Sequence, residues 1–509
     1  MDRRSFIGLV GASAVLPSTL SGLERYFPQE ARRHPLSRPP TTSADGFTMT
    51  ARQAAVDVGP GSVQAYTING TVPSPTIRTR QGERIRIDLV NQLSEPTIMH
   101  WHGLAVPQEA DGHPRLAIDP GQTYSYDYPI LNRAGTYWYH PHPHHRTAAQ
   151  TYLGLGGFLI VADDEEDGYE LPSGDYELPL MLQDKRLGGG LSLSYDVARH
   201  DLMHGLIGDT AVTNGVVDAT VDVSRTRYRL RIANGCNARI LNLGLSNGAS
   251  MTVIGSDGGL VDAPTHVDRI LLAPAERADV VVDFSGASPG ERVMLRSFTF
   301  DVPGMMGMGG MGRGGGGRGG RGGGGRGGRG GRGGMGMMGG DVQGATEMDF
   351  LEFVVQDARP EAGPPLPARF APVPDRGEPT GSTPRQTFTF TSSMMGPGGP
   401  MHAINGLQFE MLRVDARIPR MESQIWTFVN DSQLPHPVHA HAGQFRPISR
   451  TGGRGRLMPW EDGLKDTILI LPGESVDVMA RFYYEGLYLL HCHNLEHEDM
   501  DMMINFEVV

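Results

Sequence analysis

The segment HCHNLEHEDMDMM, residues 491–503, contains three histidines, one cysteine and three methionines. On a β-strand alternate side chains point to the same face, so His491 and His493 share one face and Cys492 takes the other. His497 follows five residues after Cys492, and Met502 five residues after that. Thiolate, imidazole and thioether groups are all ligands that suit copper. The segment therefore predicts a strand with metal ligands on both faces.

The His-x-His pattern of this segment occurs in three other places, MHWHG, WYHPH and VHAHA. These stretches contain His100 and His102, His140 and His142, and His439 and His441. Together the four pairs supply eight imidazoles, enough for several metal ions held between the two ends of the chain. In HPHPHHR the additional His144 and His145 leave the choice of pair open on alternation alone. His436, in LPHPVH, joins Cys492, His497 and Met502 to complete the two-His, one-Cys, weak-Met set of a blue copper site.

Short alternating runs outside these clusters predict an all-β chain. Examples are RIRIDLVNQ (84–92), TYSYDYPIL (123–131), RYRLRIANG (227–235) and SVDVMARFYYEG (475–486). Runs of period two with frequent turn residues are typical of β-sandwiches or barrels. The acidic DDEEDG (163–168) and the proline-rich 357–375 divide the runs into three blocks, 45–165, 166–362 and 363–509. Blocks of this size suit one β-sandwich each.

The stretch 304–340 contains only glycine, methionine and arginine, and it lies between two predicted strands at 292–300 and 349–357. Its Arg-Gly-Gly repeats suggest RNA binding, but it lacks the aromatic residues that stack on bases. The whole chain carries a net charge of −12, and such an acidic protein is repelled by phosphate. Nucleic acid is therefore excluded as the main partner. A disordered surface loop and a methionine site for Cu(I) both stay open for this insertion.

The N-terminus, MDRRSFIGLVGASAVLP, places Arg3 and Arg4 before a modest apolar run. This pattern predicts a twin-arginine export signal, although an uncleaved anchor or a chance pair would look similar. We assign 1–44 to the signal and a linker, and expect a periplasmic or extracellular protein. No later segment has eighteen consecutive apolar residues, so no membrane span is expected in the mature chain.

On these motifs, together with NGTVPSPTIRTRQGERIRI and NGCNAR, the chain resembles the three-domain multicopper oxidases, which include laccases and bacterial cuprous oxidases of the copper-efflux type. The resemblance implies three cupredoxin-like Greek-key β-sandwich domains and four copper ions. It assigns His100 and His439 to a type 2 copper. It assigns His102, His140, His142, His441, His491 and His493 to a type 3 pair, and His436, Cys492, His497 and Met502 to a type 1 copper. The partners implied are dioxygen and a small-molecule or metal-ion electron donor, and we expect a monomer.

Two carboxylates match acids that the family uses to supply protons to dioxygen, namely Asp111 in VPQEADG and Glu498 beside His497. A turn-forming Asp111 and a solvated Glu498 are the alternatives. The middle block has no His-x-His pair, so we expect it to be structural. Its cysteine, Cys236, is expected to be a buried thiol.

The identity of the electron donor stays open between phenols or aryl amines and Cu(I). Cuprous oxidases of this type place Asp and Met just before the first type 1 histidine, whereas Leu434 occupies the methionine position here and Asp431 lies one residue further off. Only Met394, Met395 and Met401 form a methionine group in the third block. The rival interpretations are a copper-resistance or storage protein without turnover, and a copper-free relative that serves in cell-envelope assembly.

Overall fold

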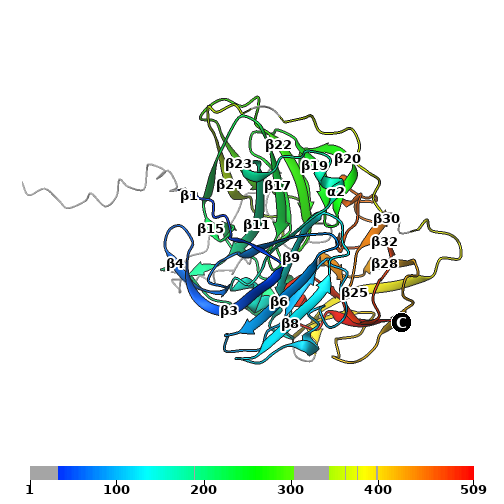
Figure 1. The fold of residues 1–509 in the computed structure, drawn as a ribbon. Helices are drawn as coiled ribbons and strands as arrows, with labels where there is room; N and C mark the ends of the chain where they lie inside the picture. Colours follow the sequence, from blue (N-terminus) through cyan, green and yellow to red (C-terminus); the bar gives the residue numbers. More distant parts are fainter. Residues whose placement is uncertain (1–32, 189, 303–342, 361–362, 375–376, 397–398) are drawn as a thin grey trace, which may run out of the picture.

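The computed structural model describes residues 33–188, 190–302, 343–360, 363–374, 377–396 and 399–509. Its strands form three pairs of facing sheets that follow one another along the chain (Figure 1). Each pair encloses its own hydrophobic cluster, so the fold consists of three β-sandwiches. The all-β prediction is confirmed.

The first sandwich contains residues from Thr41 to Ala162, drawn in blue and cyan in Figure 1. One sheet has the order β4 (Ser62–Ile68), β3 (Asp45–Asp57), β6 (Arg84–Asn91), β8 (Thr123–Pro129). The other has the order β2 (Thr41–Ser43), β5 (Ser74–Arg80), β10 (Gly157–Ala162), β9 (Gly135–Pro141), β7 (Met99–His102). The alternation in β6 buries Ile85, Ile87 and Leu89 between the sheets. Two short helices, η1 (Pro114–Leu116) and α1 (Thr147–Tyr152), lie between these strands, and α2 (Asp164–Asp167) follows the last of them.

The middle sandwich is drawn mainly in green. Its larger sheet has the order β15 (Val216–Val217), β14 (Thr210–Thr213), β11 (Glu177–Lys185), β17 (Arg227–Asn234), β22 (Arg277–Asp283), β19 (Met251–Ser256), β20 (Gly259–Val267). The second has the order β1 (His34–Pro35), β16 (Ala219–Val223), β24 (Met348–Val355), β23 (Arg292–Ser297), β18 (Leu241–Leu245), β21 (Ile270–Leu272). A small hairpin of β12 (Leu187–Gly188) and β13 (Ser192–Leu193) precedes the helix α3 (Arg199–His204), and η2 is Gly174–Tyr176.

The third sandwich is drawn from yellow to red. One sheet has the order β26 (Gly399–Ile404), β25 (Arg385–Gly396), β28 (Gln424–Asn430), β32 (Ser475–Ala480), β30 (Phe445–Thr451). The other has the order β27 (Ala416–Ile418), β34 (Met503–Val508), β33 (Gly486–Cys492), β29 (His436–Ala440), β31 (Thr467–Ile470). The helices are η4 (Pro459–Glu461) and α4 (Leu495–Glu498), and α4 begins two residues after the His-Cys-His triplet.

Two predicted connections can be compared with the structure. The strands flanking the glycine-rich insertion, β23 and β24, pair antiparallel with each other, so the insertion joins neighbouring strands as predicted. The insertion itself, like the proposed export signal, lies outside the described residues. The segment interpreted as linker before residue 45 differs from the prediction, because His34–Pro35 pairs with β16 and Thr41–Ser43 pairs with β5. Its extended backbone thus completes the edges of two different sandwiches.

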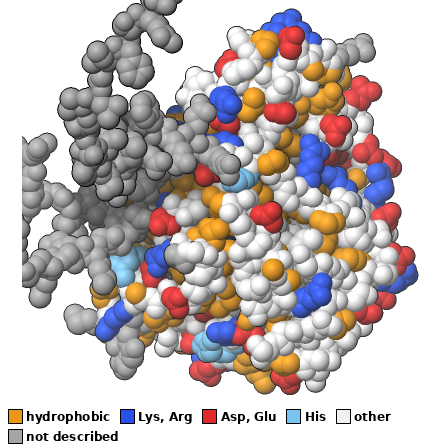
Figure 2. Space-filling model, turned by 90° about the vertical axis from the view of Figure 1, so that its left-hand side faces the viewer, with side chains coloured by type: hydrophobic (Ala, Val, Ile, Leu, Met, Phe, Trp, Pro, Cys, Tyr) orange, Lys and Arg blue, Asp and Glu red, His pale blue; other side chains and the backbone are white. Residues whose placement is uncertain are grey.

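The face of the molecule in Figure 2 carries acidic and basic side chains that are interspersed with one another. Over the described part of that face, this mixed surface gives no large field of one sign. Within the described residues, no helix is long and apolar enough to cross a membrane.

Candidate metal centre

Four strands carry the predicted histidine ligands to the boundary between the first and third sandwiches. β7 is an edge strand that pairs antiparallel with β9, which places His100 opposite His140. In the third sandwich β29 pairs with β33, which places His439 opposite His491. The backbone register therefore aligns each His-x-His pair with a second pair before any metal is considered.

His100 and His439 meet across this boundary with their Nε2 atoms 3.2 Å apart. Nδ1 of His100 donates to the carbonyl of Asp111 at 2.6 Å, and Nδ1 of His439 donates to the carbonyl of Asp466 at 2.8 Å. A carbonyl oxygen can only accept, so each ring carries its proton on Nδ1. Two Nε2 lone pairs then face each other, an arrangement that a cation between them would stabilise.

A second group consists of His102, His140 and His493. Nε2 of His102 donates to Oδ1 of Asp466 at 2.9 Å, which leaves the lone pair of this ring on Nδ1. Nε2 of His140 lies 3.2 Å from this Nδ1 of His102 and 3.4 Å from Nε2 of His493. Nδ1 of His140 donates to the carbonyl of Pro141 at 3.0 Å, so its Nε2 is also unprotonated.

A third group consists of His142, His441 and His491. Nε2 of His491 lies 3.1 Å from Nε2 of His441 and 3.5 Å from Nε2 of His142. Nδ1 of His441 donates to Oδ2 of Asp111 at 2.8 Å, which again directs an unprotonated nitrogen toward the centre of the group. All eight predicted imidazoles are thus brought together in three convergent sets.

Burial keeps these imidazoles neutral. It lowers the pKa of His140 to about 3 and that of His142 to about 4. The pKa values of His100, His439 and His441 fall well below their ordinary value, because burial and the neighbouring imidazoles both oppose protonation. The neutral ring is the form that binds a metal.

The sulfur-containing site lies on the opposite face of the same strand. Sγ of Cys492 lies 3.4 Å from Nδ1 of His436 and 3.7 Å from Nδ1 of His497. Met502 is fully buried in the same core cluster as Cys492. Because α4 begins two residues after His493, its single turn places the side chain of His497 beside Cys492. The predicted two-His, one-Cys set is therefore assembled, with the thioether buried beside it.

The two predicted proton donors contact the histidine groups directly. Asp111 is fully buried, accepts from His441, and has no hydrogen-bond partner for Oδ1 among the described residues. Burial raises the pKa of Asp111 well above its ordinary value. Glu498 lies 3.2 Å from Nδ1 of His491 and 3.4 Å from Nε2 of His142. Burial alone would raise the pKa of Glu498, but these two imidazoles lower it.

The middle sandwich, for which we expect a structural role, also contacts a side chain that holds one of the predicted ligands. Arg277 of β22 is fully buried and forms a bidentate ion pair with Asp466, at 2.7 and 2.5 Å. Asp466 in turn accepts from His102, so the arginine orients a carboxylate that orients a predicted ligand. No motif in the sequence signals this contact, because Arg277 stands 189 positions from Asp466.

The middle sandwich also covers the sulfur-containing site. Nε2 of His497 donates to the carbonyl of Met203 in α3 at 3.0 Å. His402 stacks on His497 with ring centroids 3.9 Å apart, and its Nε2 donates to the carbonyl of Leu202 at 3.0 Å. His402 was not singled out from the sequence, since it is a lone histidine without a repeated pattern.

The remaining residues of these motifs lie outside the ligand groups. His144 pairs with Asp501 at 3.0 Å and lies outside the three histidine groups. Cys236 is a buried free thiol, as predicted. Met503 is buried and Met500 is half-buried, so these two methionines flank the site without joining the Cys492 cluster.

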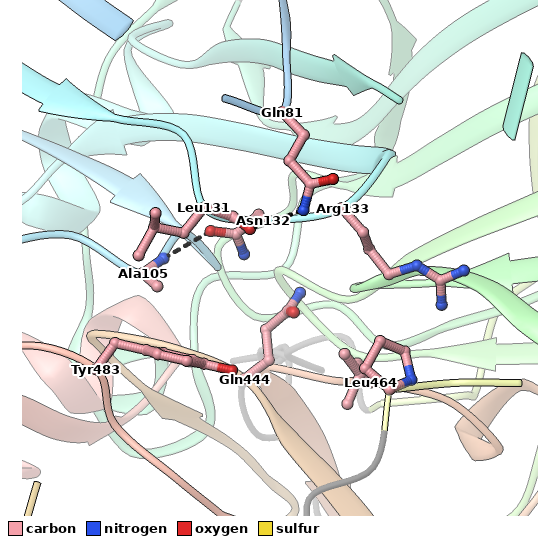
Figure 3. A pocket seen from close by; sticks show the side chains of 9 residues that line it. Gln81, Ala105, Leu131, Asn132, Arg133, Gln444, Leu464 and Tyr483 are labelled. Atoms are coloured by element: carbon pink, nitrogen blue, oxygen red, sulfur yellow. Dashed lines mark hydrogen bonds between the residues drawn. The ribbon is translucent and has the colours of Figure 1, made fainter. Parts of the chain in front are cut away.

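A pocket of about 370 Å³ opens between the first and third sandwiches (Figure 3), and none of the residues that line it is a histidine. Asn132 lines it, accepts from the backbone of Ala105 and donates to the carbonyl of Gly103. Gln444 points its amide toward Asn132 from the opposite wall in Figure 3. The pocket therefore reaches the segment that immediately follows His102.

The comparisons with known proteins agree with this geometry. Family profiles described as multicopper oxidase match residues 49–166, 198–306 and 376–509. A laccase from Bacillus stratosphericus is 30% identical over 502 residues, covering 87% of this chain and 90% of that one. The chain belongs to the multicopper oxidase family. It is accordingly an oxidoreductase that binds copper and couples the oxidation of a reducing substrate to the reduction of dioxygen.

Solved structures extend the likeness to the fold. The McoA multicopper oxidase from Aquifex aeolicus superimposes with a TM-score of 0.79 at 32% identity, covering 94% of this chain and 99% of that chain. The three sandwiches are thus cupredoxin-like, as expected. A cell division protein FtsP from Xenorhabdus nematophila is 39% identical, but over 229 residues, which are 45% of this chain and 48% of that protein.

The residues present fit copper. Where two unprotonated imidazole nitrogens face one another, neither can donate a hydrogen bond to the other, and both can bind a metal ion. The thiol with two imidazoles and a thioether is the ligand set of a blue copper site. The side-chain hydrogen bonds on the outer nitrogens fix the orientation of the rings.

Proposed function

We propose that the oxidase holds four copper ions at the sites assembled by these histidines. His436, Cys492, His497 and Met502 hold a type 1 copper. His100 and His439 hold a type 2 copper. The type 3 pair is held by His102, His140 and His493 on one side and by His142, His441 and His491 on the other. The facing Nε2 lone pairs of His100 and His439, 3.2 Å apart, are the observation that carries this assignment.

When bound, the coppers supply one-electron oxidation of the donor and storage of the four electrons that dioxygen requires. Cys492 lies between His491 and His493 in the chain, so the thiol site and the histidine groups are joined by a few covalent bonds. The pairing of β29 with β33 fixes this arrangement, because Val438 lies opposite Cys492 and His439 lies opposite His491. The polypeptide thereby fixes the distance between the site that accepts electrons and the sites where dioxygen reacts.

Asp111 and Glu498 supply the protons in this proposal. Their environments separate their pKa values, since burial favours the protonated form of Asp111 while the imidazoles favour the ionised form of Glu498. Such a pair suits a relay, in which Asp111 holds a proton to donate and Glu498 takes up a proton before it passes it on. Asp111 touches His441, and Glu498 touches His142 and His491, so both carboxylates reach the type 3 histidines.

We further propose that the chain is exported by the twin-arginine route and acts as a monomer in the periplasm or outside the cell. The N-terminal Arg3–Arg4 pair supports the route. For the electron donor we favour broad laccase-like oxidation of phenols and aryl amines, with oxidation of metal ions such as Cu(I) as a physiological use.

The decisive experiment measures copper per chain, the visible and electron paramagnetic resonance spectra, and oxygen uptake with a phenol. Four coppers, an intense blue band and oxygen consumption are expected. Copper binding without oxygen uptake would instead support a storage protein, and a protein purified without copper that binds none on reconstitution would support a copper-free relative.

A further inference from the structure

The outer edge of the proposed type 1 site is covered by one short helix. His497 is only 1% exposed, and its outer nitrogen donates to the carbonyl of Met203. The stacked His402 donates to the preceding carbonyl, that of Leu202. Two consecutive carbonyls at the end of α3 therefore hold both imidazoles, and a bulky donor cannot touch the ring of His497 without moving this helix.

The edge of the other type 1 histidine is also closed. Nε2 of His436 lies 2.9 Å from Oγ of Ser432, and both residues are buried. Ser432 is further held by Asn430 and by the carbonyl of Leu434. Both type 1 histidines are therefore covered, His436 by Ser432 and His497 by α3.

The same helix carries a pair of metal-ligating side chains. His200 and His204 stand at positions i and i+4, and their ring centroids lie 4.4 Å apart. His200 is exposed, whereas Nδ1 of His204 is buried and has no hydrogen-bond partner among the described residues. Two histidines at this spacing on one helical face are a recurrent metal-binding arrangement.

We propose that His200 and His204 form a binding site for a copper ion that donates its electron to the oxidase. The inference rests on the proposed function, because the electron must be accepted at the site of His436, Cys492 and His497. It places the metal-ion substrate of this enzyme on α3, outside the twelve proposed copper ligands.

The covalent structure of α3 makes the connection between His204 and His497 short. The carbonyl carbon of Met203 is bonded to the backbone nitrogen of His204, and its oxygen accepts the hydrogen bond from His497. A Cu(I) ion at the pair loses one electron and leaves as Cu(II), while the electron passes along this peptide group and hydrogen bond. Four such ions, four protons and one dioxygen give two waters, which balances the reaction.

The test compares H200Q/H204Q with the parent enzyme, because glutamine keeps the helix and removes both imidazoles. H266Q is the matched control, since His266 is an exposed histidine on β20 of the same sandwich. Silver(I) serves as a probe for Cu(I) that the enzyme does not oxidise. The double variant is expected to bind one silver ion fewer per chain than the parent and H266Q, as measured by equilibrium dialysis of the copper-loaded proteins.

Turnover gives the second readout. In H200Q/H204Q, kcat/KM for Cu(I) is expected to fall about tenfold or more, while the blue band and kcat/KM for a phenol stay as in H266Q. Equal silver binding in all three proteins, or a parallel fall for Cu(I) and the phenol, would overturn the site on α3. Failure of the proposed function looks different, because the parent enzyme itself would then lack the blue band and oxygen uptake.

Discussion

Glu498 shows how single residues divide the chemistry of this site, because its carboxylate contacts two proposed type 3 ligands while Asp111 contacts a third. We predict that E498Q and D111N each slow reoxidation of the fully reduced enzyme by dioxygen, by about 10²–10⁴. Glutamine and asparagine keep the shape but cannot deliver a proton. Stopped-flow absorbance measures the reoxidation, and reduction of the blue centre by a phenol is the internal control. Unchanged reoxidation in both variants would remove the proposed proton donors.

The two cysteines provide a matched pair at the same scale, since both are buried and only Cys492 lies beside histidine nitrogens. C492S replaces the thiolate by a weaker copper ligand, so we expect the blue band and turnover with every donor to be lost. C236S changes a thiol whose sulfur lies 3.7 Å from the carbonyl of Leu182, and it should keep the spectrum. Visible absorbance at equal copper content is the measurement. An intact blue band in C492S would exclude the assigned ligand.

At the scale of elements, the end of β7 is fixed by a glycine. Gly103 follows His102 with a φ of +86°, and a Cβ there would lie 2.2 Å from Oδ2 of Asp466 and 2.9 Å from Arg277. Gly121 has a similar φ of +84° but nothing within 4 Å of the added atom. We predict that G103A and G121A share a backbone cost of about 1–2 kcal/mol. G103A should lose a further 1–3 kcal/mol, approximately, from overpacking.

The measurement for this pair is the thermal midpoint together with copper content. G103A should also bind less copper, because the clash pushes Asp466 away from His102, whereas G121A should be fully loaded. If the two variants have the same midpoint and the same copper content, the close approach at Gly103 does not position the ligand strand.

The elements also show what could be inferred from the sequence. The runs at 84–92, 123–131 and 227–235 became β6, β8 and β17 with nearly the predicted bounds, because period two reports a half-buried strand directly. The ligand histidines were found because each pair repeats a spacing that has a geometric meaning. Arg277 and His402 act through partners distant in sequence, and a lone buried arginine or histidine carries no local pattern that reveals its partner.

At the scale of the whole molecule, buried ion pairs join the sandwiches. Glu166 at the end of the first sandwich accepts from Arg229 and Arg231 of the middle one. Burial would raise the pKa of Glu166, yet the two guanidinium groups lower it to about 2. Its folded pKa lies below the unfolded value, so this carboxylate stabilises the fold above about pH 4.5 and loses that contribution as pH falls toward 2.

We therefore predict that E166Q lowers the thermal midpoint at pH 7 and that the difference from the parent narrows between pH 5 and 3, approximately. The lowered pKa of Glu166 corresponds to about 3 kcal/mol of the free energy of unfolding at neutral pH. D164N is the control, because Asp164 is a neighbouring, fully exposed carboxylate paired with Arg80 at the surface. A difference between E166Q and the parent that stays constant over this pH range would contradict the assignment.

Arg277 joins all three sandwiches, and the last prediction concerns this residue. Its Nε donates to the carbonyl of Thr136 in the first sandwich at 2.9 Å, while its guanidinium pairs with Asp466 in the third. R277M would leave Asp466 buried without its partner, and breaking a buried pair in this way costs about 3–5 kcal/mol. R292M is the matched control, since Arg292 pairs with Glu352 but its side chain is 63% exposed. An exposed pair of that kind is worth roughly 0–1 kcal/mol.

Because Asp466 orients His102, the same substitution should affect chemistry as well as stability. We expect R277M to slow reoxidation by dioxygen while leaving reduction of the blue centre by a phenol unchanged, since the type 1 residues do not contact Arg277 in the described structure. R277K keeps the charge but loses the two-pronged contact, so its reoxidation rate should lie between those of R277M and the parent. If R277M matches R292M in both thermal midpoint and reoxidation rate, the middle sandwich has only a structural role after all.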